Sequence, residues 1–404
     1  MSMSKLRWRA ASALIAAGAA AAATLGLTVP ALGSARAAPP LATPGWHLRQ
    51  QFGTCGSSFG VRSVTATRAR NAWATGDYSV LSNGECSPAG LLIAHWDGNS
   101  WQNKRPPIGF RPHFNPYSVG HAVASLSASY AWVFTNRKYN ASPVTQSFAL
   151  LWQNGRWRVL QLADDSAITS AVAFTRSNAW GFGYLRSSST GQLAAYAVRF
   201  NGQGWRAAPV PVLAQGTAAP APDNIWAVGP LASAASKPFP QPYALARWTG
   251  RWRTIPFPNL GLPGGEGVNA AWVAADGSQG AWVAGDVVHN QPFQRVGGVL
   301  LHWTGSRWVD VELPFQTHGL GPLSNDGRSG LWIASLPATC CDALDMAHYS
   351  AGQFSVTPVP VPSEDGLAVT TMQFIPRTRC VWAGGFLVAG TNGDMFSVMF
   401  RYDP

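Results

Sequence analysis

Charged residues are scarce in this 404-residue chain: Asp, Glu, Lys and Arg make up only 12% of it, about half the usual share. Glutamate and lysine, which dominate long exposed helices, occur only four times each. This shortage excludes a coiled coil, a long helical bundle and a charge-rich disordered chain. A mean hydropathy of +0.01 excludes a protein built from many membrane-spanning helices.

Several motifs of ligand chemistry are missing as well. The sequence contains no HxH, HExxH or CxxC spacing for a transition metal and no DxDxDG loop for calcium. It also contains no glycine-rich phosphate loop that opens a helix. We therefore expect no bound metal and no cofactor.

The first residues are typical of an export signal. Lys5, Arg7 and Arg9 precede an apolar, alanine-rich stretch at residues 10–32, and residues 35–37 (ARA) form an A-x-A cleavage pattern. We predict a signal peptide at residues 1–37 and a mature domain at residues 38–404, either secreted or associated with the cell surface. The alternative is a leader retained as an anchor, since the apolar stretch is long enough to cross a bilayer. In both cases we expect membrane contact only through the leader.

The basic balance of the chain is carried by arginine. The formal net charge is +11, and it is +7 without the four bases of the leader. Such a balance favours anionic polymers as partners. However, the bases are spread along the chain and form no Lys/Arg run, so we expect no nucleic-acid partner.

One pattern recurs seven times after the leader: a strand of the form AWxxG, a variable stretch, and an apolar strand that ends in HWxGxxW. It reads, for example, RNAWATGD with LIAHWDGNSW and QGAWVAGD with LLHWTGSRW. The first position is always tryptophan: Trp73, Trp132, Trp180, Trp226, Trp282, Trp332 and Trp382. The second is always aromatic: Trp96, Trp152, Phe200, Trp248, Trp303, Tyr349 and Tyr402. The third comprises Trp101, Trp157, Trp205, Trp252, Trp308 and Phe354, and its missing seventh member is Trp46 at the other end of the chain.

This repeat predicts an all-β fold, a seven-bladed β-propeller with four antiparallel strands per blade. A single blade cannot bury its aromatic face alone, so neighbouring blades must stack. Within each blade we name the strands a to d from the inside outward, with AWxxG on strand b and the HW segment on strand c. The segment around Trp46 is then expected to supply the outer strand of the last blade and to close the ring. His95, His302 and His348 occupy a strand-c position that holds arginine in other repeats, which indicates a structural role.

The repeat resembles the kelch-type propeller. The last repeat is the most similar, because VWAGGF, FRYDP and the wrapped GW at residue 46 match the double glycine, tyrosine and tryptophan of a kelch unit. The other repeats depart from it, with one glycine after the tryptophan and tryptophan in place of tyrosine. The chain also looks like the tryptophan-rich propellers that high-GC bacteria secrete. The resemblance covers the mature chain and implies an architecture rather than an activity.

Candidate binding residues lie in the long connections between strands b and c and between blades. In a propeller these connections share one face, and irregular loops on a rigid scaffold commonly carry binding residues. Near blade two, arginine side chains that can form bidentate hydrogen bonds lie beside aromatic rings that can stack, which suits a sugar or an anionic polymer as ligand. These residues are Arg111, His113, Tyr117, Arg137 and Tyr139. A second cluster on blade five comprises Asp286, His289 and Arg295. The alternative is that these loops pack on each other.

Trp272 lies outside the repeat positions. It is expected on the inner strand of blade five, where its side chain packs in the core.

Export would place the five cysteines in an oxidising compartment, where pairing is expected and one must remain over. Cys55 and Cys86 fall in loops of the same face, so we predict that they form a disulfide. Cys340 and Cys341 fall in one loop, as an adjacent bridge or two thiols. Cys380 falls in a turn of the opposite face and is predicted to be free. The alternative is that all five cysteines are unpaired and lie in packed loops.

Together these patterns predict an extracellular binding scaffold. The expected partner is a glycan, an anionic cell-wall polymer or a protein, and the expected state is a monomer. The alternative is an extracellular carbohydrate-active hydrolase or lyase that uses acids of the same face; Asp286 with Asp77 or Asp165 is a conceivable pair, but nothing in the sequence brings them together. A copper-radical oxidase is a weaker alternative.

Overall fold

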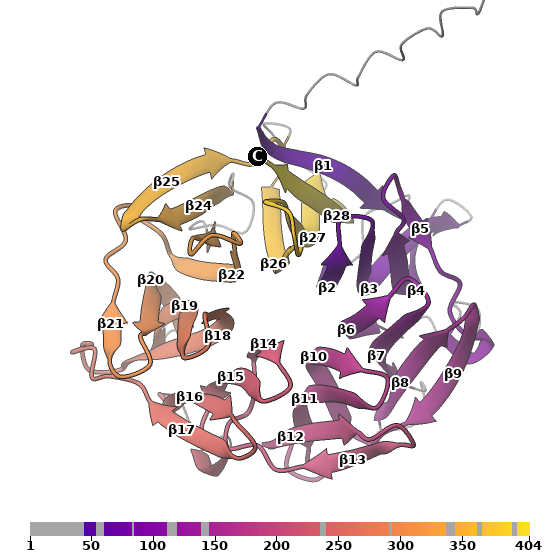
Figure 1. The fold of residues 1–404 in the computed structure, drawn as a ribbon, viewed down its shortest axis with the longest axis horizontal. Coiled ribbons are helices and arrows are strands. Elements are labelled where there is room, and N and C mark those ends of the chain that lie inside the picture. The colour runs from indigo at the N-terminus through magenta and orange to yellow at the C-terminus, as the bar shows by residue number, and fades with distance from the viewer. Residues whose placement is uncertain are drawn as a thin grey trace, which may run out of the picture. The chain divides into compact units, whose positions relative to one another are not determined.

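The computed structural model contains seven four-stranded antiparallel sheets, which are arranged around a central axis as the blades of a β-propeller (Figure 1). It describes residues 44–53, 60–82, 85–110, 119–138, 145–234, 240–290, 293–336, 344–361, 366–389 and 394–404. The compact unit that spans Ala42–Pro404 contains every strand of all seven blades. This unit therefore contains the whole of the described propeller, and the predicted fold class is confirmed.

Each blade is built from four strands that follow one another from the inner to the outer edge of its sheet. Blade one consists of β2 (Val61–Arg68), β3 (Asn71–Ser82), β4 (Glu85–Trp96) and β5 (Trp101–Asn103). Blade two consists of β6 (Val119–Ser127), β7 (Tyr130–Lys138), β8 (Thr145–Gln153) and β9 (Arg156–Gln161). Blade three consists of β10 (Ser166–Thr175), β11 (Asn178–Arg186), β12 (Leu193–Phe200) and β13 (Trp205–Ala208). Blade four consists of β14 (Gly216–Ala221), β15 (Asn224–Pro230), β16 (Tyr243–Trp248) and β17 (Trp252–Pro256).

Blade five consists of β18 (Glu266–Asp276), β19 (Gly280–Asn290), β20 (Phe293–Trp303) and β21 (Trp308–Asp310). Blade six consists of β22 (Gly319–Asn325), β23 (Leu331–Leu336), β24 (Asp345–Ser350) and β25 (Gln353–Pro358). Blade seven consists of β26 (Gly366–Phe374), β27 (Val381–Ala389), β28 (Asp394–Asp403) and, from the other end of the chain, β1 (Gly45–Phe52). Two short 3-10 turns, η1 (Ile108–Phe110) and η2 (Ala232–Ala234), complete the elements. Among the described residues, no helix is long and apolar enough to cross a membrane.

The ring is closed by β1, as the sequence predicts. β1 pairs antiparallel with β28, so that Gly45 lies opposite Asp403 and Trp46 lies opposite Tyr402. Trp46 is buried with 2% of its surface exposed, and it packs on Trp332 of the preceding blade. The first strand of the propeller is thereby fixed to the last one both by hydrogen bonds and by an aromatic core.

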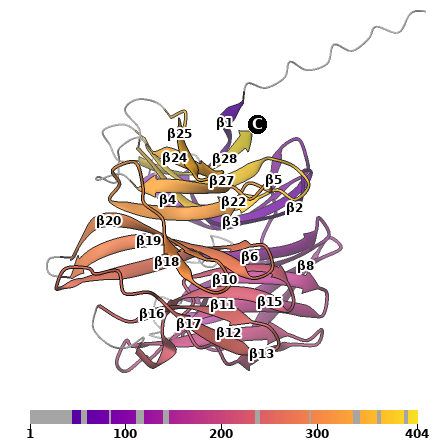
Figure 2. The ribbon, with the colours of Figure 1, turned by 60° about the vertical axis from the view of Figure 1, so that its left-hand side comes forward.

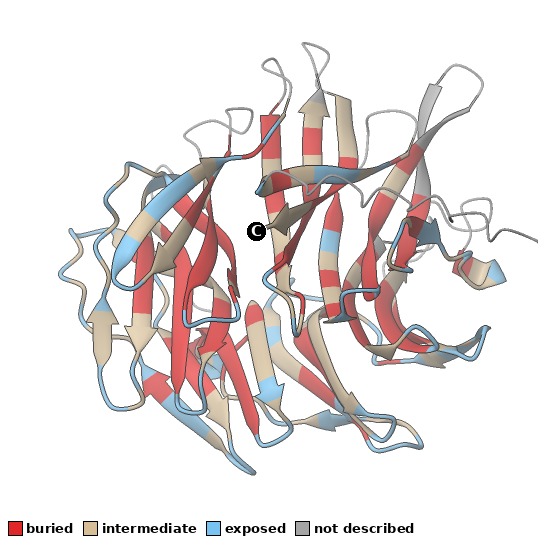
Figure 3. Ribbon diagram, turned by 45° about the horizontal axis from the view of Figure 1, so that its top comes forward, coloured by how far each residue is buried: buried red, intermediate tan, exposed pale blue. Residues whose placement is uncertain are grey.

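The hydrophobic cores lie between neighbouring blades. The buried residues, red in Figure 3, lie mainly on the strands rather than on the connections between them. Trp382 of blade seven is fully buried and makes T-shaped contacts with Trp96 and Trp101 of blade one. Trp132 of blade two meets Trp205 of blade three in the same way. Aromatic rings in such edge-to-face contact stabilise a core beyond the area that they bury. The repeat positions are therefore the contacts that hold the ring together.

Each strand-b tryptophan also faces the residue that precedes the strand-c aromatic. His302 stacks on Trp282 at a centroid distance of 3.9 Å and contacts Asp276 at 2.8 Å. In blade four, the guanidinium of Arg247 takes the same place over Trp226. Both bases present a flat, polar group to the ring, which explains why the repeat accepts either; blade two has Leu151 at this position. The structure therefore uses this position for packing.

The two sides of the ring differ. Figure 2 shows the molecule turned from the view of Figure 1. The a–b turns and c–d hairpins all open on one side, which we call the tight-turn face, and all of them lie within the described residues. The b–c and d–a connections open on the other side, which we call the variable-loop face.

Candidate functional site

On blade five, the structure joins two of the three predicted residues directly. Asp286 on β19 is buried, and its Oδ2 accepts a hydrogen bond of 2.9 Å from Nε of Arg295 on β20. The Arg295 side chain is about half exposed. His289 lies opposite Glu266 of β18 instead, three register positions further along. The cluster is thus an ion pair with an adjacent histidine and glutamate, and its role in binding stays a prediction.

The electrostatics of Asp286 are unusual for an aspartate. Burial raises its pKa above the ordinary value, and the neighbouring Arg295 opposes that rise without cancelling it. A buried carboxyl group with a perturbed pKa near the variable-loop face is a functional-site candidate on physical grounds.

A hydrogen-bond chain connects this blade to the one before it. Gln215 donates from Nε2 to the Tyr243 hydroxyl over 3.3 Å, and that hydroxyl donates to Oδ1 of Asn269 over 2.9 Å. Asn269 lies opposite Asp286 in the β18–β19 register. Burial raises the pKa of Tyr243 to about 12, so the phenol remains a neutral donor at physiological pH. Polar side chains of blades four and five thus lie next to one another in the order Gln215, Tyr243, Asn269 and Asp286.

Tyr243 also lines a pocket between blades four and five. The pocket has a volume of about 300 Å³ and opens on the variable-loop face. Its wall combines the rings of Tyr243 and Phe257, whose centroids are 6.4 Å apart, with aliphatic and polar side chains. The full lining comprises Gln241, Tyr243, Phe257, Pro258, Asn259, Leu260, Leu262, Glu266 and Val268. We call it the blade-four/five pocket.

Sequence reasoning missed this pocket. Its one available signal was that Tyr243 and Phe257 are aromatic residues outside the repeat positions, as Trp272 is. The repeat could not pair them, because one belongs to strand c and the other to the connection that leads into blade five.

Of the candidate binding residues near blade two, only Arg137 lies within the described residues. Arg111, His113, Tyr117 and Tyr139 lie outside the described residues. Arg137 is half-buried, and its guanidinium lies 5.5 Å from the Phe110 ring centre and 5.0 Å from that of Phe148. It also donates to Gln146 over 3.0 Å. Much of its side chain is thus engaged within the fold, and its role in binding stays a prediction.

The central channel is a second cavity, of about 490 Å³, lined by all seven inner strands. Many of its side chains are small hydroxyl groups that link one blade to the next. Ser63, for example, accepts from the backbone N–H of Val123 over 3.1 Å. Trp272 lines the channel and packs against the core between blades five and six. Arg62 is its one charged residue among the described lining.

The three acids that the sequence offers as a catalytic pair lie on different blades. Asp77 is on β3 of blade one, where Arg62 approaches it to 3.9 Å. Asp286 is on blade five, and Asp165 lies in the connection into blade three. Asp165 accepts a hydrogen bond from the backbone N–H of Thr145 over 2.8 Å. The three acids thus have different partners and belong to separate local networks.

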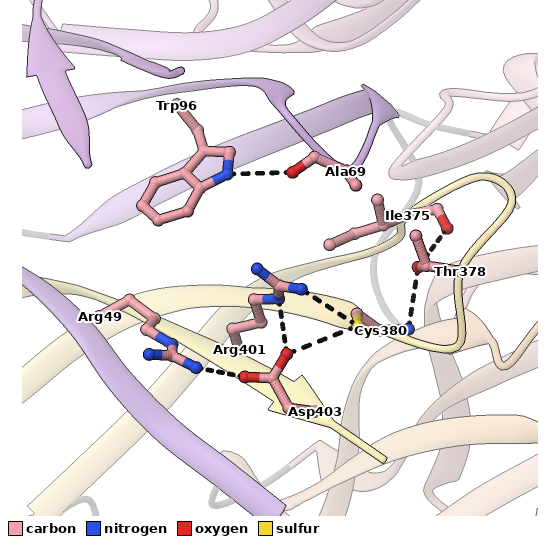
Figure 4. A network of polar contacts seen from close by, with 8 residues as sticks. All are labelled: Arg49, Ala69, Trp96, Ile375, Thr378, Cys380, Arg401 and Asp403. Carbon is pink, nitrogen blue, oxygen red and sulfur yellow. Dashed lines mark hydrogen bonds and ion pairs between the residues drawn. The ribbon is translucent and has the colours of Figure 1, made fainter. Parts of the chain in front are cut away.

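Of the five cysteines, Cys380 alone lies fully within the described residues. Cys380 is a free, buried thiol in the a–b turn of blade seven, as predicted. It donates toward Asp403, and Arg401 donates to its sulfur over 3.2 Å (Figure 4). Cys55, Cys340 and Cys341 lie outside the described residues, as does the side chain of Cys86. Within the described part of the chain, no cluster of three His, Cys, Asp or Glu side chains could hold a metal ion.

Comparison with known proteins shows the fold. No protein-family model and no curated protein matches the chain. The structure is similar to that of YCF48 bound to D1 peptide, with a TM-score of 0.53 and 11% identity over 91% of this chain and 99% of that one. It is also similar to a GH74 enzyme of Niastella koreensis, with a TM-score of 0.53 and 9% identity over 85% of this chain. This chain spans about half of that enzyme, 54% of its length.

A third similar structure is the β-propeller domain of the trilobed protease from Pyrococcus furiosus, with a TM-score of 0.50 and 8% identity over 87% of this chain and 95% of that domain. That domain is described as having an open velcro topology, whereas β1 closes the ring here. At such low identities, these likenesses establish that the chain folds as a β-propeller and leave its ligand to be argued from its own side chains.

Proposed function

We propose that this protein is an extracellular binding propeller that takes a glycan in the blade-four/five pocket. The observation that carries the proposal is the composition of the pocket wall, in which Tyr243 and Phe257 lie beside Glu266. The proposal includes export by the leader at residues 1–37, a mature domain at residues 38–404 and a kelch-like relationship of the blades.

A sugar ring matches this wall chemically. Its C–H faces pack on aromatic and aliphatic side chains, here Phe257 and Leu260, while its hydroxyl groups need directed polar partners. Gln241, Asn259 and Glu266 offer amide and carboxylate groups for such hydrogen bonds. A small apolar pocket with a few convergent polar groups is the usual form of a binding site for a small ligand.

A direct test is a glycan array probed with residues 42–404, with cell-wall fractions and an extracellular protein library as the competing partner classes. We expect glycan hits whose affinity falls at least tenfold in Phe257→Ala and in Glu266→Gln. The matched controls are Ile108→Ala, an exposed apolar residue of another inter-blade connection, and Glu312→Gln, an exposed acid between blades five and six. Glycan binding that all four variants retain would disprove the assignment of the pocket.

The alternative of a hydrolase or lyase rests on Asp286. Its raised pKa suits a general acid. Glu266 and Asn269 are three residues apart on β18, and Asn269 lies opposite Asp286, so Glu266 and Asp286 point to opposite sides of the sheet. The two carboxyl groups therefore do not face each other across one pocket, as a glycosidase requires. Binding without cleavage is the function that this geometry supports better.

A further inference from the structure

The tight-turn face carries an arginine ring. Nine arginines lie in its a–b turns and c–d hairpins or at the strand ends beside them, and each of the seven blades contributes at least one. All nine are exposed: Arg68, Arg70, Arg156, Arg176, Arg251, Arg307, Arg328, Arg377 and Arg379. We use the name arginine ring for this set.

Few acids balance the arginine ring. Asp97 and Asp223 are the two exposed acids in the same turns. The other aspartates of this face already have basic partners: Asp276 with His302, Asp326 with His348, and Asp403 with Arg401. Within the described part of the chain, no ion pair involves any member of the arginine ring. Positive charge is therefore left over on this face.

On the variable-loop face, the described acidic residues outnumber the basic ones. The acids described on or near the variable-loop face are Asp77, Asp164, Asp165, Glu266, Asp286, Glu312, Asp345 and Asp394, and the bases are Arg62, Lys104, Arg105, Arg137, Arg186 and Arg295. Three further exposed arginines, Arg158, Arg206 and Arg253, lie on outer strands, so the excess positive charge of the described propeller lies on the tight-turn face and on the outer edge of the ring. The described part of the variable-loop face carries no such excess, so the charge orients the tight-turn face toward a negative surface.

The start of β1 lies on the same face. Gly45 pairs with Asp403, at the end of strand c, so the chain enters the propeller on the tight-turn side.

We propose that the tight-turn face docks on a bilayer that contains anionic lipids and leaves the variable-loop face free to bind ligand. A planar surface fits the arrangement better than a linear polymer, because the arginines encircle the ring rather than follow one groove. The attraction is electrostatic: among the described residues, no exposed large apolar side chain lies in these turns to insert into lipid. This proposal departs from the expectation that membrane contact occurs only through the leader, and it does not depend on the glycan pocket.

The test uses residues 42–404, which lack the leader and keep all strands. Co-sedimentation is measured with vesicles of phosphatidylcholine alone and with an equal mixture of phosphatidylcholine and phosphatidylglycerol. We expect binding to the anionic vesicles only, lost at high salt because exposed charges are screened. In Arg377→Gln/Arg379→Gln the affinity should fall about 25-fold, since one arginine near an anionic surface contributes about fivefold.

The matched control is Arg105→Gln/Arg186→Gln, which removes the same charge from exposed positions outside the arginine ring and should bind within about twofold of the unmodified protein. Unfolding curves of both variants verify the fold. An equal loss in the two variants would mean that only net charge matters and would overturn the proposal. Equal binding to neutral vesicles would overturn it too, as would binding to soluble polyphosphate without binding to vesicles. Unchanged glycan binding in Arg377→Gln/Arg379→Gln separates this proposal from the function of the pocket.

Discussion

Trp46 of β1 packs edge-on against Trp332 of β23, with ring centroids 5.4 Å apart and an interplanar angle of 86°. The same relationship joins Trp101 of blade one to Trp382 of blade seven. The outer strand of one blade thus contacts the second strand of the blade before it. Trp46 reproduces this contact, although it comes from the opposite end of the chain.

The first prediction concerns this contact. Trp46→Ala should lower the free energy of unfolding by about 3–5 kcal/mol, as expected for the loss of a buried tryptophan from a core. Leu48→Ala in the same strand removes a side chain that is 46% exposed and should change it by no more than about 0.5 kcal/mol. Urea denaturation of residues 42–404 measures both. Closure by Trp46 would be refuted by superimposable curves for the two variants.

The second prediction concerns Trp272. Because it packs on the core between blades five and six, Trp272→Phe should cost about 1 kcal/mol of stability. It should leave the affinity for any glycan within about twofold, since the proposed pocket lies on the other side of the blade. Titration calorimetry beside thermal unfolding separates the two effects. A selective loss of binding in a fully folded variant would instead place the ligand in the channel.

The third prediction is a pH dependence that arises from His95. Burial, with a contribution from Lys104, lowers the pKa of His95 to about 4, while the unfolded value is about 6.5. The unfolded state therefore binds more protons between these values, and stability should decrease as the pH falls from about 6.5 to 4. The contribution is at most on the order of 3 kcal/mol, and His95→Gln should remove it. Unfolding curves measured across this range would contradict the assignment if both proteins showed the same slope.

The fourth prediction concerns the thiols. Cys380 is buried and free, so a thiol reagent should label it only after denaturation. Non-reducing peptide mapping should recover Cys55 linked to Cys86, while Cys340 and Cys341 appear as an adjacent bridge or as two thiols. Recovery of Cys380 in a disulfide with Cys340 or Cys341 would contradict this pairing scheme.

The sequence was sufficient for the architecture because the blades repeat the same physical requirement. Each needs a tryptophan on strand b to contact the aromatic residues of the next blade, and this need appears as a period in the sequence. Closure by Trp46 followed from the same count. The histidine and arginine of strand c were also interpretable, because their exchange between repeats shows what the position tolerates.

The candidate site was less predictable because it has no period. Tyr243 and Phe257 meet only where two blades come together, and nothing in their spacing indicates that. The contacts of Arg137 with Phe110 and Phe148 were equally unpredictable, because they depend on how the chain folds between blades one and two. The arginine ring was invisible for a similar reason: its members are far apart in the sequence, and only the ring brings their turns to one face.

Ring closure also imposes an order in time. The strand that is made first, β1, has as its partner β28, which is made last. While the chain emerges from the ribosome or crosses a membrane, residues 45–52 cannot take their final place until residues 394–403 have arrived. A nascent chain interrupted before that point would expose the strand edge of β27 together with an unpaired β1, both open to proteases and to other chains. The ring can therefore close only after β28 has been made, and a chain terminated before that strand is recognisable by its open ring.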